Sequence, residues 1–212
     1  MSSESSEPSG LLRRAGDGDA GALGELFALY RDRLRVMVRL RLDRRLQGRL
    51  DPSDVLQEAY LEACERFPDY ARQPDLPFFV WLRFLTAQKL LVLHRRHLGA
   101  KVRDAAREIS LYRGALPEAS SAALAAQLVG HRTTPSAAAM RAEMQIRLQE
   151  ALNGMDALDR EVLALRHFEQ LSNAETARVL GLRESAASMR YARALLRLKD
   201  ILVRPAGGPG EV

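Results

Sequence analysis

The stretch LSNAETARVLGLRESAASMRYARALLRLK, which runs from Leu171 to Lys199, decides the fold predicted for this chain. Ser172 is a candidate N-cap and Glu175 follows three residues later, so the two can form a capping box at the start of a helix. Gly181 can adopt the backbone conformation that ends this helix, and a second helix should start at Glu184 or Ser185. Two helices joined by a short turn that contains glycine predict a helix-turn-helix.

The second of these helices has two different faces. One stripe is apolar and should be buried, because its residues recur at steps of three and four: Ala187, Tyr191, Ala194 and Leu198. The opposite face is small, hydroxylated and cationic, and it comprises Ser185, Ser188, Met189, Ala192 and Arg193, with Arg190 and Arg197 on the flank. Small side chains let a helix approach base edges and arginine can bind guanine or phosphate, so this face suits the major groove of duplex DNA.

An ordinary helical hairpin with solvated arginines is the alternative interpretation of this stretch. Between Arg160 and Arg204 there are nine basic residues and five acidic ones, a net charge of +4 that favours DNA. The whole chain of 212 residues is also basic, with a net charge of +5 and a pI of about 9.8. Both values favour a polyanionic partner.

The composition predicts an all-α fold, since helix formers dominate and strand-like runs are nearly absent. The single cysteine, Cys64, excludes an internal disulfide and a cysteine-based metal cage, and we expect it to be a small buried hydrophobe. His94 and His97 have no nearby carboxylate or thiol that would complete a metal site, so we expect no metal and no cofactor. The N-terminus lacks the features of a signal peptide and no apolar run could span a bilayer, so we expect a soluble, cytoplasmic protein.

Changes in composition divide the chain into two small helical domains joined by a linker. Residues 1–10 are rich in Ser, Glu, Pro and Gly and predict a disordered tail. Residues 11–107 form the N-terminal domain, residues 108–135 a linker with at most one weak helix at 118–129, and residues 136–204 a C-terminal domain that contains the helix-turn-helix. Residues 205–212 form a second tail.

An acidic helix stands out in the N-terminal domain. Asp51, Pro52 and Ser53 signal its start, and residues 51–70 contain six acids and one base. The preceding segment, residues 31–49, contains eight arginines and two aspartates. The acidic face can pair with that basic segment inside the molecule or dock on a basic protein surface, and helical periodicity does not choose between the two.

The segment FFVWLRFLTAQKLLVLHRRHLGAKVRDAAR, which begins at Phe78, follows a proline-rich loop at residues 68–77. It combines aromatic side chains with cations, with seven bases and one acid between Arg83 and Arg107. Rings can stack on unpaired bases and cations can bind the backbone, so the segment suits single-stranded nucleic acid. The alternative is that the rings are core residues, which we expect for Trp81 and for about half of the others because of their helical spacing.

Two blocks of sequence, taken together, resemble one family. The first block is DPSDVLQEAYLEACERF followed by FFVWLRFLTAQKLLVLHRRH, and the second, after a linker, is LDREVLALRHFEQLSNAETARVLGLRESAASMRYARALLRLK. Together they resemble the extracytoplasmic-function (ECF) group of bacterial RNA polymerase sigma factors. The resemblance covers about residues 11 to 107 and 136 to 202. It implies a specificity subunit, with no enzyme activity of its own, that binds core RNA polymerase and directs promoter-specific transcription initiation. An anti-sigma factor is a further partner that the resemblance allows.

The resemblance also implies roles for individual residues. The implied polymerase-binding residues are Asp54, Gln57 and Glu58 at the clamp, and Leu163, Arg166 and Phe168 at the flap. The implied contacts to the melted non-template strand of the minus-ten element are Tyr70, Arg72, Phe78, Phe79, Trp81, Arg83, Phe84, Gln88, Lys89, Arg95 and Arg96. The implied contacts to the duplex minus-thirty-five element are Arg183, Glu184, Ser185, Ser188, Met189, Arg190 and Arg193.

This sequence departs from the family pattern at several positions. Gln88 stands where many relatives have Asn, Val92 where they have an acid, and Ser185 and Ala186 where they have a Gly-Thr pair. Thr176 replaces a large aliphatic residue, and a buried hydroxyl there should weaken packing unless it bonds back to a carbonyl. Two rival functions are a conventional helix-turn-helix regulator that acts without polymerase and a helical interaction protein that binds no nucleic acid.

Overall fold

The computed structural model describes residues 6–43, 45–46, 48–98, 118–130 and 138–203. Helices and turns make up these residues, which contain no strand, so the all-α prediction is confirmed. The chain divides into two compact units, one that includes described residues 6–98 and one that includes described residues 118–203. In the described part of the chain, every helix is too short or too polar to cross a lipid bilayer.

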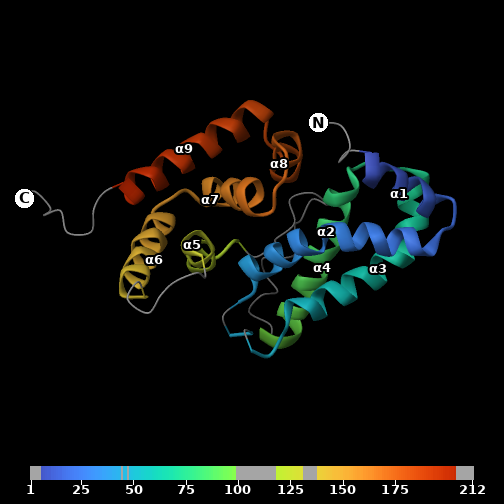
Figure 1. The fold of residues 1–212 in the computed structure, drawn as a ribbon, viewed down its shortest axis with the longest axis horizontal. Helices are drawn as coiled ribbons and strands as arrows, with labels where there is room; N and C mark the ends of the chain where they lie inside the picture. The colour runs from blue at the N-terminus through green and yellow to red at the C-terminus, as the bar shows by residue number, and fades with distance from the viewer. Residues whose placement is uncertain (1–5, 44, 47, 99–117, 131–137, 204–212) are drawn as a thin grey trace, which may run out of the picture. The chain divides into compact units, whose positions relative to one another are not determined.

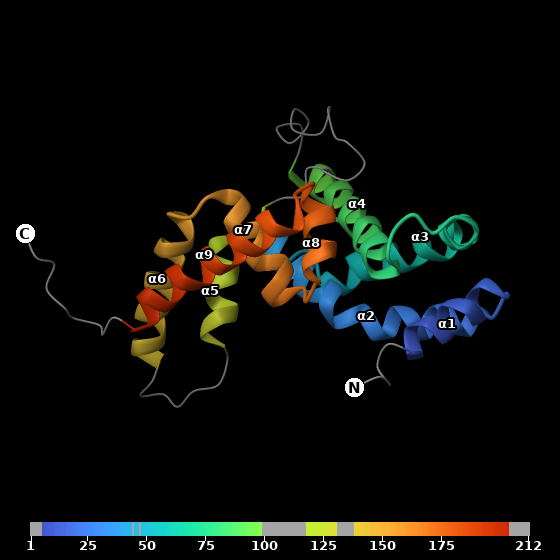
Figure 2. The same cartoon turned by 90° about the horizontal axis from the view of Figure 1, so that it is seen from above.

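The first unit contains α1 (Ser6–Gly16), α2 (Ala20–Arg41), α3 (Pro52–Arg72) and α4 (Phe78–Leu98). Helix α1 packs on α2, and α2, α3 and α4 pack against one another (Figures 1 and 2). The core between them is aliphatic, with fully buried side chains that include Leu26, Leu34, Met37, Val55, Leu82 and Leu90. Burial of this apolar surface is the main stabilising term of the unit.

Three expectations for the first unit are wrong. Residues 6–10 belong to α1 rather than to a disordered tail, because Leu11 and Ala15 bury the apolar side of that helix. Helix α3 runs through Pro68 to Arg72, although Pro68 was expected to begin a loop, since Phe67 and Tyr70 on either side of it are buried. Cys64 is exposed rather than buried.

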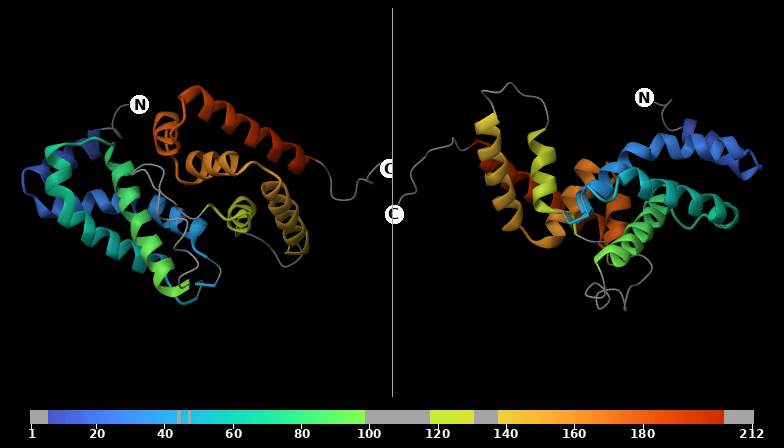
Figure 3. Two further views of the ribbon diagram at one scale, coloured as in Figure 1. Left: turned by 180° about the vertical axis from the view of Figure 1, so that it is seen from behind. Right: turned by 90° about the horizontal axis from the view of Figure 1, so that it is seen from below.

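The second unit contains α5 (Ser121–Val129), α6 (Ala138–Asn153), α7 (Ala157–Leu163), the π-helical turn η4 (Ala164–Phe168), α8 (Asn173–Leu180) and α9 (Glu184–Val203). Helices α5 and α6 form an antiparallel pair (Figure 3). Helix α9 packs on α6, α7 and α8. Asp156 caps α7, and the helix widens into a π turn after Leu163.

The weak helix expected at residues 118–129 is present as α5 (Ser121–Val129), but it belongs to the second unit rather than to the linker predicted at residues 108–135. Ser120 caps α5, Gly130 ends it with a φ of 71°, and Leu124 and Ala125 are fully buried. The Ala119 N–H donates to a Glu161 carboxylate oxygen at 3.2 Å, which joins the start of α5 to α7. A short Ala-rich segment has a weak helix signal alone, but here it gains a packing partner in α6. The tails at residues 1–5 and 205–212 lie outside the described residues.

Candidate nucleic-acid interface

Local backbone chemistry builds the helix-turn-helix of α8 and α9 as the sequence predicts. The Ser172 hydroxyl accepts from the Glu175 N–H at 3.2 Å, and the Glu175 carboxylate accepts from the Ser172 N–H at 2.7 Å. Gly181 has a φ of 61°, and the Gly181 and Leu182 N–H groups donate to the Arg178 and Ala177 carbonyls. This Schellman arrangement ends α8 and turns the chain into α9.

A side-chain hydrogen bond sets how α9 starts. The Asn173 amide, at the beginning of α8, donates to the Glu184 carbonyl at 2.9 Å. The two helices are therefore joined at their first residues as well as through the turn. The contact orients the N-terminal part of α9, which carries the residues expected to face DNA.

The two faces of α9 are those expected from its periodicity. Ala187, Ala194 and Leu198 are buried, and Tyr191 is partly buried. The opposite surface is exposed and comprises Arg183, Glu184, Ser185, Ser188, Met189, Ala192 and Arg193. We refer to this set as the α9 face. Met189 is 63% exposed, so an apolar side chain stands open to solvent beside hydroxyl and guanidinium groups.

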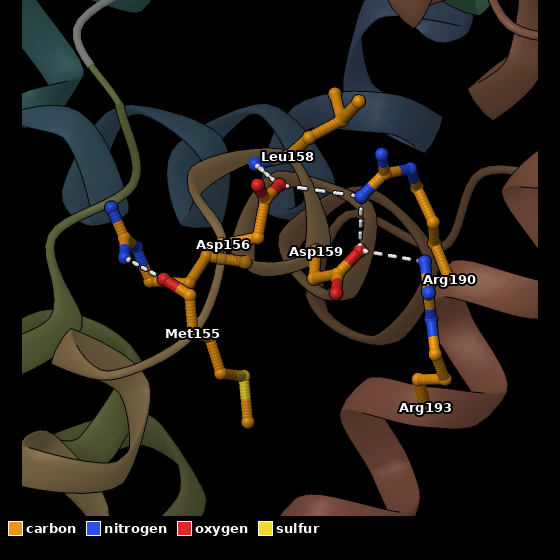
Figure 4. Close-up of polar contacts among 7 residues, drawn as sticks. Met155, Asp156, Leu158, Asp159, Arg190 and Arg193 are labelled. Atoms are coloured by element: carbon orange, nitrogen blue, oxygen red, sulfur yellow. Dashed lines mark hydrogen bonds and ion pairs between the residues drawn. The ribbon is translucent and has the colours of Figure 1, made fainter.

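Arg190 differs from its neighbours, because acidic residues of α7 hold it. Its Nη1 donates to Asp159 Oδ1 at 2.6 Å and to Asp156 Oδ1 at 3.3 Å (Figure 4). Arg193 lies on the same side, with its Nη2 at 3.7 Å from Asp159 Oδ1. Neither aspartate could be predicted from the sequence as a partner of α9, because both precede Arg190 by more than thirty residues.

The residues expected at the polymerase flap lie in different environments. Leu163 is fully buried, whereas Arg166 and Phe168 are partly exposed. The Arg166 guanidinium lies 5.0 Å from the centre of the Tyr191 ring, so η4 contacts α9 through a cation–π pair. Only Arg166 and Phe168 of the three therefore have surface available for a partner.

Several aromatic residues expected to hold single-stranded DNA pack inside the first unit. Tyr70, Phe78 and Phe79 are buried, whereas Trp81, expected to be a core residue, is partly exposed. The Tyr70 and Trp81 rings stack with centroids 4.6 Å apart, and the Tyr70 hydroxyl donates to the Leu76 carbonyl at 2.8 Å. Burial raises the pKa of Tyr70 to about 12.

The basic residues of α4 and of the end of α3 are of two kinds: some are buried or paired with an acid, and others are exposed to solvent. Arg83 is buried, and the Lys89 ammonium lies 2.7 Å from Glu62 on α3. Hydrogen bonding from Lys89 lowers the pKa of Glu62, which also pairs with Arg66. Arg95 and Arg96 are exposed, as is Arg72, which pairs with Asp69 on its own helix. Phe84 and Gln88 are partly exposed.

The acidic face of α3 is open to solvent near its start. Asp54 and Gln57 are exposed and Glu58 is partly exposed. Asp54 also has a structural role, because its carboxylate accepts from the Asp51 N–H at 3.2 Å in a capping box. Other acids of α3 pair with Arg66 and Arg72 on the same helix and with Lys89 on α4.

Comparisons with known proteins agree with this arrangement. The family model Sigma-70, region 4 matches residues 145–198, which include α7, η4, α8 and most of α9. The ECF RNA polymerase sigma factor SigD of Mycobacterium tuberculosis (strain ATCC 25618 / H37Rv) is 31% identical over 186 residues, covering 88% of this chain and 79% of SigD. The ECF RNA polymerase sigma factor BldN of Streptomyces coelicolor is 24% identical over 200 residues, covering 94% of this chain and 67% of BldN.

A solved structure extends the likeness to the fold. CnrH, in complex with the cytosolic domain of CnrY, superposes with a TM-score of 0.52 at 24% identity, covering 91% of this chain and 94% of CnrH. The SigD match spans most of both chains, and the Sigma-70 region 4 match coincides with the helix-turn-helix built above. The chain therefore belongs to the ECF RNA polymerase sigma factors, which direct RNA polymerase to promoters.

Proposed function

We propose that this sigma factor reads the minus-thirty-five element of its promoters through the α9 face. The observation that carries the proposal is that this face is exposed, small and cationic while the other side of α9 is buried. Ser185 and Ser188 let the helix backbone approach base edges, and Arg183 and Arg193 can bind guanine or phosphate. Glu184 and Met189 complete the surface.

The minus-ten element, in this proposal, binds one side of α4. Trp81, Phe84 and Gln88 recur at steps of three and four, and Arg95 lies two turns beyond Gln88, so the four residues share one side of the helix. Partly exposed rings can stack on unpaired bases, and the exposed Arg72, Arg95 and Arg96 can bind the strand. The buried residues expected at this element would position the exposed side chains by packing under them; they are Tyr70, Phe78, Phe79 and Arg83. Lys89 is paired with Glu62.

Core RNA polymerase, in the same proposal, binds the acidic face of α3 through Asp54, Gln57 and Glu58, and binds the second unit through Arg166 and Phe168. Fully buried Leu163 would support the latter surface from below. The chain would act as a specificity subunit in the cytoplasm and catalyse no reaction itself. Linking two weak DNA contacts on one chain raises the effective concentration of each at the promoter. An anti-sigma factor is a third proposed partner.

In vitro transcription from a library of genomic fragments tests the function. Core polymerase with the chain should initiate at start sites that core polymerase alone does not use. Arg193→Gln should weaken initiation at these sites and reduce its salt dependence. If no new start site emerges with the wild-type chain, the proposal is wrong.

The polymerase surface is best tested at Glu58, because Asp54 also caps α3. Glu58→Arg should lower the affinity for core polymerase severalfold while the helical circular dichroism stays unchanged. Asp32→Arg is the matched control, since it reverses an acid on α2 whose side chain is 95% exposed. Equal affinities for wild type and Glu58→Arg would exclude Glu58 from the contact, whereas no binding of the wild-type chain to core polymerase would favour a regulator that acts without polymerase.

A further inference from the structure

Two acids at the start of α7 face the DNA-reading helix. Asp156 and Asp159 stand one helical turn apart, so their carboxylates lie on the same side of α7. Figure 4 shows both directed toward Arg190 of α9, which donates to both, with Arg193 beside Asp159. One carboxylate oxygen, Asp159 Oδ1, therefore lies close to two arginines of α9, Arg190 and Arg193.

Burial makes the Asp159–Arg190 pair different from an ordinary surface ion pair. The Asp159 side chain is 17% exposed and the Arg190 side chain 26% exposed, whereas Arg193 is 63% exposed. A partly desolvated pair at 2.6 Å is screened less by salt than a pair in open solvent. Arg190 is thus held against α7, while Arg193 remains open on the outer surface.

The roles of Asp156 and Asp159 can be separated. Asp156 Oδ1 also accepts from the Leu158 N–H at 2.9 Å and caps α7, and its side chain is 61% exposed. Its contact with Arg190 is the longer one, at 3.3 Å. Asp159 has the shorter contact and no capping duty, so a change at Asp159 tests the pair with α9 without removing the cap.

An arginine at position 190 with no acid beside it could bind any phosphate that came within reach. Phosphate contacts are independent of sequence, so such an arginine would raise binding to every duplex and lower discrimination. We propose that Asp159 is a positioning residue that increases the specificity of DNA binding. Its carboxylate holds Arg190 against α7, so Arg190 stabilises the packing of α9 on α7 and only the exposed α9 face contacts DNA. This inference rests on the proposed minus-thirty-five role of α9 and assigns Arg190 to support rather than to DNA contact.

Asp159→Asn in the full chain tests the inference, because asparagine keeps the shape and removes the charge. One probe is a 30-bp duplex of unrelated sequence, bound to the free chain over a range of salt concentrations. Affinity for this duplex should rise severalfold, and the slope of log K against log salt should steepen by about 0.9, the effect of one added phosphate contact. A purely structural role for Asp159 would not steepen the slope.

The second probe is a promoter fragment found by the transcription experiment above, bound by the chain with core polymerase. The same fragment with its minus-thirty-five region replaced by unrelated sequence is the competitor. Asp159→Asn should lower the ratio of the two affinities severalfold. Asp200→Asn is the matched control, since it removes the same charge from an exposed position farther along α9 and should leave the ratio and the slope unchanged.

The double variant Asp159→Asn with Arg190→Gln identifies the arginine responsible. Removing Arg190 in this background should return the slope and the affinity for the unrelated duplex to wild-type values. An unchanged slope and ratio in Asp159→Asn would overturn the inference. So would a loss of promoter affinity in Arg190→Gln as large as that in Arg193→Gln, a comparison that holds even if Asp159→Asn fails to fold.

The two proposals can fail separately. If the wild-type chain supports no new start site, the proposed function fails, while the slope on the unrelated duplex still reports on Arg190. If the wild-type chain supports start sites and Asp159→Asn behaves like the wild type, only the role of Asp159 fails.

Discussion

Thr176 carries a hydroxyl into the interior of the helix-turn-helix. Its side chain is fully buried, and Oγ1 has no hydrogen-bond partner among the described residues. A hydroxyl buried at this position should weaken packing unless it bonds to a carbonyl, and the structure shows no such bond. A buried polar group without a partner costs free energy of folding, because it gives up its bonds to water.

Thr176→Val should therefore stabilise the protein by about 1 kcal/mol, since it replaces the hydroxyl by a methyl group of similar size. Urea unfolding followed by circular dichroism measures the change in free energy of unfolding. Thr176→Ser is the control, because it keeps the hydroxyl and removes a methyl group, and it should destabilise. A lower stability for Thr176→Val than for the wild type would show that the hydroxyl has a partner in solution.

At the scale of the element, the turn between α8 and α9 depends on Gly181. Its φ of 61° lies in the left-handed region, where a Cβ is strained. Gly181→Ala should cost about 1–2 kcal/mol of stability. It should also weaken duplex binding, because the turn sets the direction of α9. Urea unfolding and binding to a promoter fragment measure the two effects.

Gly16 provides the control for this substitution. It ends α1, has no strained φ, and a Cβ built on it meets nothing within 4 Å. Gly16→Ala should be neutral or stabilising, since alanine favours helix more than glycine does. If the two substitutions changed stability equally, the left-handed conformation of Gly181 would not be the cause.

At the scale of the whole molecule, each unit buries its own core. Leu26, Leu34 and Leu82 are buried in the first unit, and Leu124, Leu148 and Leu152 are buried in the second. Trp81 is the single tryptophan and lies in the first unit, stacked on Tyr70. Its fluorescence therefore reports on the unfolding of the first unit alone.

We expect the two units to unfold independently. Thr176→Val, in the second unit, should leave the urea midpoint of the Trp81 fluorescence unchanged while it shifts the transition seen by circular dichroism. Tyr70→Phe, in the first unit, should lower the Trp81 midpoint, because the hydrogen bond to the Leu76 carbonyl is lost. A Trp81 midpoint that moved with Thr176→Val would mean that the units unfold together.

The sequence by itself determined where several helices start and stop and which side of α9 is buried. The residues that cap or end these helices bond to backbone groups, or set the backbone conformation, within a few positions of themselves, so their effect can be predicted without knowing the fold. They are Asp51, Ser172 with Glu175, Asp156 and Gly181. The apolar stripe of α9 follows in the same way from the repeat of the helix. The two blocks of family resemblance were also present in the sequence alone.

Only the tertiary structure decided which polar and aromatic side chains are held inside each unit. Asp159 meets Arg190 across 31 residues of chain, Glu62 meets Lys89 between two helices, and the short Ala-rich α5 is held by α6. On α3, Tyr70 is buried while Cys64 is exposed, and on α4, Phe78 is buried while Trp81 keeps exposed surface. Helical periodicity gives the direction of a side chain on its own helix, but burial and pairing depend on which helix packs against that side.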